Sequence, residues 1–134
     1  MVSVIQRLLS LRSHSPVGVA QLWIVRHRSH AMNLTDDQFN KALEIFQEFG
    51  PRRRIPVQKR WAEVFRTATI EDFEEWQLVF RDIEAFALKA ALQVRDRLLD
   101  GDSAIRQISE RFPRLSRDRV SHTYSQAVYF SMYE

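Results

Sequence analysis

Apolar side chains between residues 36 and 49 recur every three or four positions, which is the spacing of one face of an α-helix. The apolar positions are Phe39, Ala42, Leu43, Phe46 and Phe49. Thr35 precedes this segment and Gln38 stands three residues later, an arrangement typical of a capping box. Gly50 and Pro51 interrupt the pattern, because neither residue favours a helix interior. The sequence therefore predicts a helix from Asp36 to Phe49.

The longest periodic segment begins after Thr69, a second cap residue, and runs from residue 70 to about residue 99. At 1.5 Å per residue this helix would be roughly 45 Å long. Its main apolar stripe consists of Phe73, Trp76, Phe80, Ile83, Ala87, Ala90 or Ala91, Val94 and Leu98. A second apolar line with seven-residue spacing consists of Leu78, Ala85, Leu92 and Leu99. Two lines on one helix predict burial against more than one neighbour, or burial plus contact with a partner chain.

Three shorter helices complete the predicted set, and the first of them covers residues 57–66. The segment Asp-Gly-Asp at residues 100–102 is expected to end the long helix, so that Asp102 or Ser103 caps the next one. The last helix begins after Ser116, which is again a cap residue. Its predicted inward side chains are Val120, Thr123, Tyr124, Ala127 and Phe130 or Ser131.

The fold class follows from these segments. No segment alternates between apolar and polar residues for long enough to predict a strand. A chain of 134 residues is long enough for one domain with a sizeable core. We therefore predict an all-α protein in which residues 32–134 form a compact bundle of about five helices around one long central helix.

Three predicted helix starts share one pattern, found in LTDDQF at 34–39, ATIEDF at 68–73 and LSRDRV at 115–120. Each has a Thr or Ser cap, an acid two residues later and a large apolar residue four residues later. The cap binds a free backbone N–H, and the acid faces the positive end of the helix dipole. The pattern indicates helix architecture, either as part of two related hairpins offset by 47 residues or as a generic cap that repeats by chance.

The last two predicted helices carry the segment ISERF followed by LSRDRV, which resembles a helix-turn-helix. The usual turn glycine and first-helix alanine are absent, because Pro-Arg-Leu at 113–115 and Ser109 take their places. The resemblance implies that bases would be contacted by Arg117, Arg119, Ser121 and His122, with Arg114 on phosphate. The alternative is that these arginines form a solvated face and pair with acids of the long helix.

A second basic cluster places five positive charges within nine residues. It consists of Arg52, Arg53, Arg54, Lys59 and Arg60. This cluster suits a phosphate backbone or an acidic protein. It is also explained by pairing with four acids of the long helix, which are Glu71, Asp72, Glu74 and Glu75. The neighbouring Trp61 either stacks on a base or belongs to the core.

The net charge of +3 is unevenly distributed. Residues 1–31 carry four arginines and no acid, whereas residues 32–134 carry 16 basic and 17 acidic side chains and so a charge of −1. The first segment resembles an organellar presequence; the alternative is that Met32 is the true start and residues 1–31 are a poorly ordered arm. No apolar run approaches the about 20 residues of a membrane span. We expect a cytoplasmic protein, or an organellar one if the presequence is genuine.

Catalytic motifs are missing from the sequence. The chain has no cysteine, and His122 is the one histidine after residue 31. A set of Asp118, His122 and Ser121 or Ser125 would lie along one helix, where these side chains cannot converge as a catalytic triad must. Only three glycines occur, which rules out a glycine-rich phosphate loop. We therefore predict no enzymatic activity, no cofactor and no metal site.

The sequence favours a non-enzymatic protein-interaction module, an adaptor or small regulatory subunit, that binds another protein or forms a homodimer. The predicted interface on the long helix is Trp76, Leu78, Ala85, Leu92 and Leu99. The alternative is a nucleic-acid-binding regulator that uses the helix-turn-helix-like hairpin and both basic clusters.

Overall fold

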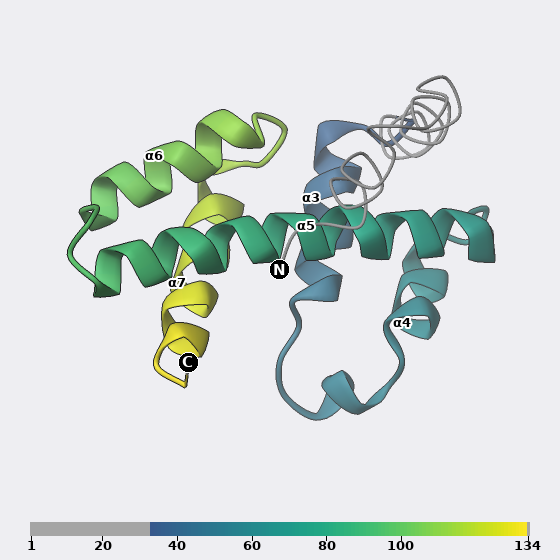
Figure 1. Ribbon diagram of the computed structural model, residues 1–134. Helices are drawn as coiled ribbons and strands as arrows, with labels where there is room; N and C mark the ends of the chain where they lie inside the picture. The colour runs from purple at the N-terminus through teal and green to yellow at the C-terminus, as the bar shows by residue number, and fades with distance from the viewer. Residues whose placement is uncertain (1–32, 134) are drawn as a thin grey trace, which may run out of the picture.

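The structure, a computed structural model, describes residues 33–133, so that the predicted N-terminal arm at residues 1–31 lies outside the described residues. Within this part of the chain the elements are α3 (Asp36–Phe46), the 3-10 helix η1 (Pro51–Arg54), α4 (Val57–Val64), α5 (Ile70–Arg95), α6 (Gly101–Arg111) and α7 (Arg117–Ser131) (Figure 1). No strand occurs among the described residues. The predicted compact all-α bundle with one long central helix is confirmed.

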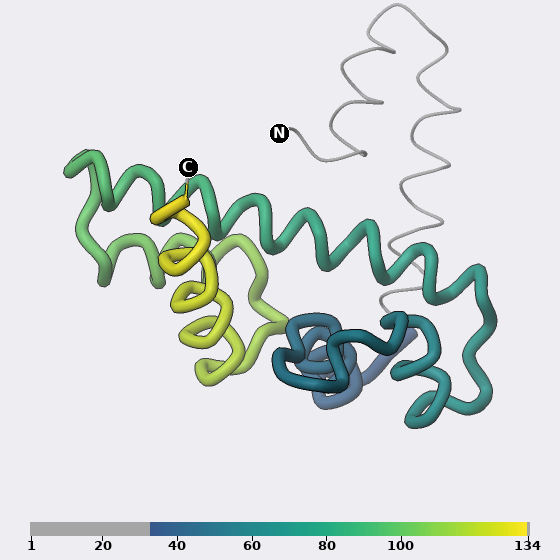
Figure 2. The backbone as a smooth tube through the Cα atoms, turned by 90° about the horizontal axis from the view of Figure 1, so that it is seen from below, coloured from purple at the N-terminus to yellow at the C-terminus, as the bar shows by residue number. Residues whose placement is uncertain are grey.

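The long helix α5 organises the bundle. The helices α3 and α4 lie near its N-terminal half, and α6 and α7 lie near its C-terminal half (Figure 1). All four lie on the same side of α5 in the orthogonal view (Figure 2). The helix α5 packs most extensively against α7 and then against α6. One long helix is therefore covered on one side by two helical pairs.

Aromatic side chains form the centre of the core where α3, α4 and α5 meet. The Trp61 indole is fully buried, and its ring lies 5.4 Å from Trp76, 5.6 Å from Phe73 and 5.9 Å from Phe80, measured between ring centroids. Its Nε1 donates a hydrogen bond of 2.8 Å to the Ala42 carbonyl. The main apolar stripe of the long helix is buried as predicted from Phe73 to Ala91, and Trp61 belongs to the core.

The helix caps largely confirm the sequence analysis. Thr35 and Thr69 both form complete capping boxes, and the Ser116 hydroxyl accepts a hydrogen bond from the Arg119 backbone N–H. The cap of α6 is Asp100, however, and not Asp102 or Ser103. The prediction failed because α5 ends at Arg95, before the expected boundary, which leaves Asp100 free to begin the next helix.

The end of α5 has a left-handed residue that the sequence did not reveal. Arg97 has a φ of 62°. The Leu98 N–H donates to the Gln93 carbonyl at 2.8 Å, and the Arg97 N–H donates to the Val94 carbonyl at 3.0 Å. These two bonds make a Schellman motif, in which the left-handed position usually holds glycine. Leu98, predicted to be inward, is 76% exposed because it lies beyond this stop.

Replacing Arg97 with glycine is expected to raise the free energy of unfolding. The left-handed conformation costs an L-residue about 1–2 kcal/mol, and the extra chain entropy of glycine offsets about 0.5–1 kcal/mol of the gain. The net stabilisation should be about 0.5–1 kcal/mol in urea denaturation. Asp96→Gly is the matched control and should destabilise the protein, because Asp96 has a φ of −85° that any residue adopts. A decrease for Arg97→Gly would contradict the strain argument.

Two helices also end earlier than predicted. The helix α3 ends at Phe46 and not at Phe49, and α4 ends at Val64 and not at Arg66. Gly50, with a φ of 90°, turns the chain into η1. Phe49 consequently leaves the α3 stripe and is 47% exposed.

Candidate functional site

The basic cluster at residues 52–60 does not present five free cations. Arg60 is only 5% exposed; its Nε donates to the Ile55 carbonyl at 2.9 Å and its Nη1 donates to the Ile45 carbonyl. The Ile45 carbonyl belongs to the last turn of α3, so Arg60 satisfies a helix end. Arg60 is thus a structural residue, which corrects the prediction that it would contact nucleic acid.

The remaining members of this cluster lie at the surface. Arg52 pairs with Glu48 at 3.3 Å and with Glu63 at 2.6 Å. Its acidic partners therefore come from α4 and the chain after α3, and not from the predicted acids of the long helix. The Arg53 guanidinium lies 5.5 Å from the centroid of the Phe49 ring. Arg54 and Lys59 are exposed.

Arg60 and its neighbour Lys59 provide a test of this assignment. Arg60→Met is expected to lower the free energy of unfolding by about 2 kcal/mol, because two buried carbonyls lose a charged donor. Lys59→Met, a substitution at an exposed position, should stay within about 0.5 kcal/mol of the wild type. Urea denaturation of both variants measures the difference. Equal effects would show that Arg60 is not a structural residue.

The helix-turn-helix-like segment is bound to α3 at its turn. The Arg114 Nε pairs with Asp36 Oδ1 at 3.0 Å, and its guanidinium lies 4.5 Å from the Phe39 ring centroid. The Asn40 amide donates to the Arg114 carbonyl at 2.9 Å and accepts from the Ser116 N–H at 2.8 Å. A recognition helix inserts its first turns into the major groove. Here those turns lie beside α3 and the acidic Asp36.

The other predicted base-contacting residues of α7 are partly engaged. The Arg119 guanidinium donates to Gln47 Oε1 at 3.4 Å, whereas Arg117 is exposed. Burial lowers the pKa of His122, and the positive charge of Arg119 lowers it further, against a smaller opposite effect of Glu44. His122 therefore favours the neutral form, which weakens it as a phosphate contact.

The residues of the predicted interface on the long helix differ in their exposure, because one is buried and four are partly exposed. Trp76 is 3% exposed and packs edge-on against Phe65 and Trp61, with ring centroids 5.1 and 5.4 Å away. This corrects the prediction for Trp76, which belongs to the core because it lies on the main stripe of α5. The rest of the predicted interface is partly exposed and consists of Leu78, Ala85, Leu92 and Leu99.

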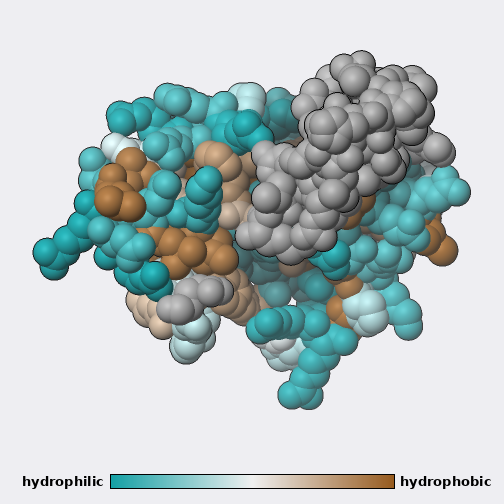
Figure 3. All heavy atoms as spheres, viewed as in Figure 1, coloured by the Kyte–Doolittle hydropathy of each residue, from teal (hydrophilic) through white to brown (hydrophobic). Residues whose placement is uncertain are grey.

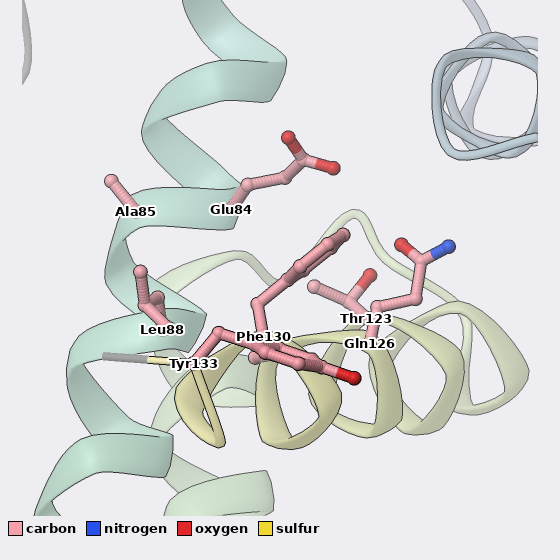
Figure 4. Close-up of a pocket in the computed structure, with 8 residues that line it drawn as sticks. Glu84, Ala85, Leu88, Thr123, Gln126, Phe130 and Tyr133 are labelled. Carbon is pink, nitrogen blue, oxygen red and sulfur yellow. The ribbon is translucent and has the colours of Figure 1, made fainter.

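A pocket of about 350 Å³ opens between α5 and α7 (Figure 4). The residues that line it are Glu84, Ala85 and Leu88 from α5 and Thr123, Gln126, Ala127, Phe130 and Tyr133 from α7 and the residues after it. Ala85 thus connects the predicted outer line of α5 with the last turns of α7. Three of these side chains are polar, and the others provide apolar and aromatic walls.

A network of hydrogen bonds fixes the polar side of this α5–α7 pocket. The Gln47 side-chain amide donates to Thr123 Oγ1 at 2.9 Å, and the Gln126 amide donates to the Gln47 carbonyl at 2.8 Å. Because only the Gln126 nitrogen can donate to a carbonyl, its orientation is set and its Oε1 lies on the side of Glu84 (Figure 4). The pocket therefore has acceptor oxygens in fixed positions.

Glu84 is the side chain of the pocket whose pKa is shifted most. Burial raises its pKa from 4.5 to about 7, and the nearby positive charge of Arg81 opposes this effect. Desolvation thus exceeds the attraction of the neighbouring cation. Near neutral pH the carboxyl group is divided between its protonated and ionised forms.

Exposed apolar side chains gather at the C-terminal end of α7, where Phe130 and Tyr133 also line the pocket. We call them the α7 apolar surface; they are Phe49, Tyr129, Phe130, Met132 and Tyr133, exposed by 47%, 50%, 40%, 71% and 73%. Phe49 and Phe130 stack with ring centroids 6.4 Å apart. A second hollow of about 370 Å³ lies beside them, lined by Phe49, Ser125, Gln126 and Tyr129. Apolar side chains also gather over the C-terminal half of α5 (Figure 3).

Sequence reasoning missed the α7 apolar surface. Its signal was the aromatic run YFSMY at residues 129–133, which is too dense to fit one helix face. The prediction left open whether Phe130 or Ser131 faces the core; Ser131 is the buried one. The outward position of Phe130 depends on the register in which α7 packs on α5.

The comparisons with known proteins do not indicate a function. A scan against protein-family models, a search of the curated proteins and a search of the solved structures each gave no match. Between residues 33 and 133, no helix has both the length and the apolar character needed to cross a membrane. The same residues contain no group of three or more His, Cys, Asp or Glu side chains that could hold a metal ion.

Proposed function

We propose that the protein is a non-enzymatic interaction module that binds a segment of another protein at the α7 apolar surface and the adjoining pocket. The observation that supports this proposal most is the exposure of Phe49, Tyr129, Phe130 and Tyr133 in one surface. Aromatic side chains are enriched at protein interfaces, and the residues that dominate binding sit around well-packed pockets.

The position of this surface also favours a protein partner. The α7 apolar surface lies at the C-terminal end of α7, which packs extensively against α5. Rigid helices present an interface without the entropy cost of ordering it on binding. A bound segment would extend from this surface across Ala85 onto the outer line of α5, which reaches Leu92.

The nucleic-acid alternative has weaker support. Of its predicted contacts, Arg60 is buried, Arg52 is paired with two acids, and Arg114 is held by Asp36. The exposed cations Arg53, Arg54, Lys59 and Arg117 come from two separate segments, and the body of residues 32–134 carries no excess of positive charge. Salt-dependent affinity for DNA needs several cations on one face.

The decisive experiment compares capture of host proteins by the full chain and by Phe130→Ser. We expect the wild type to capture a partner protein, and we expect this capture to persist after nuclease treatment. The affinity for the partner should fall about tenfold with Phe130→Ser, because an aromatic anchor contributes more than about 1 kcal/mol. Ile70→Ser is the control; Ile70 is 66% exposed but begins α5, roughly 27 Å along the helix from Leu88 at 1.5 Å per residue.

Each other outcome has a defined meaning. Capture that is equal for Phe130→Ser and Ile70→Ser would refute the proposed surface. Capture that disappears with nuclease would favour the nucleic-acid alternative. A dimer of the full chain in sedimentation that Leu92→Asp dissociates would instead make a second copy the partner.

A further inference from the structure

We propose that the α5–α7 pocket binds an alkylammonium group, the chemistry of a lysine side chain, through Glu84, Gln126 and the surrounding apolar walls. This inference rests on the proposed function for the source of the group, which is the partner protein. It names the chemistry that the partner must carry.

The polar side of the pocket is suited to a hydrogen-bond donor. Glu84 is on α5 and directs its carboxylate toward the α7 side chains, and Gln126 turns its amide oxygen to the same space (Figure 4). The Gln126 nitrogen uses one of its two N–H groups to donate to the backbone carbonyl of Gln47 at 2.8 Å, and this bond leaves the amide oxygen available to the pocket as an acceptor. An ammonium group has three donors and no acceptor, and it matches this set.

The apolar side of the pocket is suited to an aliphatic stem. Ala85, Leu88 and Ala127 line it with methyl and methylene groups, and Phe130 and Tyr133 add two aromatic rings. Cations bind favourably near aromatic rings when they are partly removed from water. Lysine combines an apolar stem with a terminal charge, as this lining requires. The volume of about 350 Å³ leaves room for such a side chain.

The negative charge of Glu84 is poorly balanced within the described residues. No ion pair or hydrogen bond to the Glu84 carboxylate occurs there, although the side chain is partly buried. Arg81 on α5 acts on it at longer range, and the Tyr133 phenol is the titratable group contributed from the α7 side of the lining. A partly buried carboxylate without a close partner is stabilised by a cation that enters the pocket.

Proton and ligand must compete for Glu84 if the proposal holds. The free carboxyl has a pKa of about 7, so a fall from pH 8 to pH 6 converts most of it to the neutral form. An alkylammonium ligand keeps its charge over this range, because its own pKa is near 10.4. The affinity should therefore fall about tenfold between pH 8 and pH 6, as expected when a group with this pKa must be ionised to bind.

The test is a titration of the full chain, followed by NMR chemical shifts, with n-butylammonium chloride and with N-acetyl-lysine methylamide. We expect both to shift the signals of the pocket residues. The uncharged n-butanol should bind at least about tenfold more weakly, as should either cation to Glu84→Gln, because a charge-assisted hydrogen bond is lost. Glu74→Gln, an exposed acid on the same helix, is the matched control and should bind like the wild type.

Each result decides the proposal. Equal binding of n-butanol and n-butylammonium, unchanged binding by Glu84→Gln, or no shifts at all would overturn it. Binding of n-butylammonium without the capped lysine would overturn the assignment to a partner's side chain and make a free amine the ligand. Lysine binding without any captured partner would contradict the proposed function alone, whereas capture through Phe130 without lysine binding would contradict this inference alone.

Discussion

Replacing Trp61 with alanine is expected to lower the free energy of unfolding by about 4 kcal/mol, which is the largest effect that we predict. The indole is fully buried and contacts rings from two other helices, including Phe46 of α3 at 6.0 Å and Phe80 of α5 at 5.9 Å between centroids. Its removal leaves a cavity that the three helices can close only by shifting towards one another, and any part that stays open adds to the cost. Urea denaturation measures the change as a lower midpoint with an unchanged slope.

Two further variants separate packing from other effects at this position. Trp61→Phe keeps most of the ring contacts but leaves the Ala42 carbonyl without its donor, so a loss of about 1–3 kcal/mol is expected. Val64→Ala is the control on the same helix; Val64 is 51% exposed, and its change should remain within about 0.5 kcal/mol. A loss for Trp61→Ala no greater than that for Val64→Ala would show that the aromatic core does not hold α4 in place.

The second large effect is a pH-dependent stabilisation by Glu84→Gln. Below pH 4.5 the carboxyl group is protonated in the folded and the unfolded protein, so the substitution changes little. Between pH 4.5 and about 7 the unfolded chain releases the proton while the folded chain keeps it. The free energy of unfolding of the wild type therefore falls as pH rises through this range.

The size of this effect follows from the difference between the two pKa values. A rise from 4.5 to about 7 corresponds to about 3 kcal/mol, at 1.36 kcal/mol per pKa unit. Glutamine is neutral at every pH, so Glu84→Gln should be more stable than the wild type by up to about 3 kcal/mol at pH 8 and nearly equal to it at pH 4. Urea denaturation at both values measures this, with Glu74→Gln as the exposed control. A variant that is less stable at pH 8 would mean that the Glu84 carboxylate is stabilised, not desolvated, by its surroundings.

Stability and binding should change in opposite directions at Glu84. The substitution that removes the desolvation cost also removes the charge that we propose holds the ammonium group. Functional sites commonly carry such a cost in stability. If Glu84→Gln is more stable and loses ligand affinity, unfolding cannot explain the loss.

The sequence predicted the helices more fully than it predicted the site. The stripe from Phe73 to Ala91 and the caps Thr35, Thr69 and Ser116 were apparent because each depends on residues within a few positions of one another. The end of α5 was predicted too late because Arg97 takes a left-handed conformation that usually marks a glycine. Because α5 ends early, Leu98 is exposed and Asp100 is the N-cap of α6.

The candidate site depends on distances across the bundle. Glu84 and Gln126 are far apart in sequence, and the periodicity of α5 alone does not tell which helix faces Glu84. Arg60 shows the same limit, because it lies in a basic run but meets the Ile45 and Ile55 carbonyls and is buried. A charge pattern in the sequence shows which side chains are charged, but it does not show which groups those side chains contact in the folded protein.

The sequence by itself determined the all-α class, the long central helix and the inward stripe, since helical periodicity and capping are local properties of the chain. Only the tertiary structure decided that Arg60 is buried, that Phe130 points outward, and that a carboxylate and aromatic rings line one pocket between α5 and α7. The physical reason is that desolvation and shape arise where helices meet, and the angle and register of α7 on α5 are set by all packed side chains together.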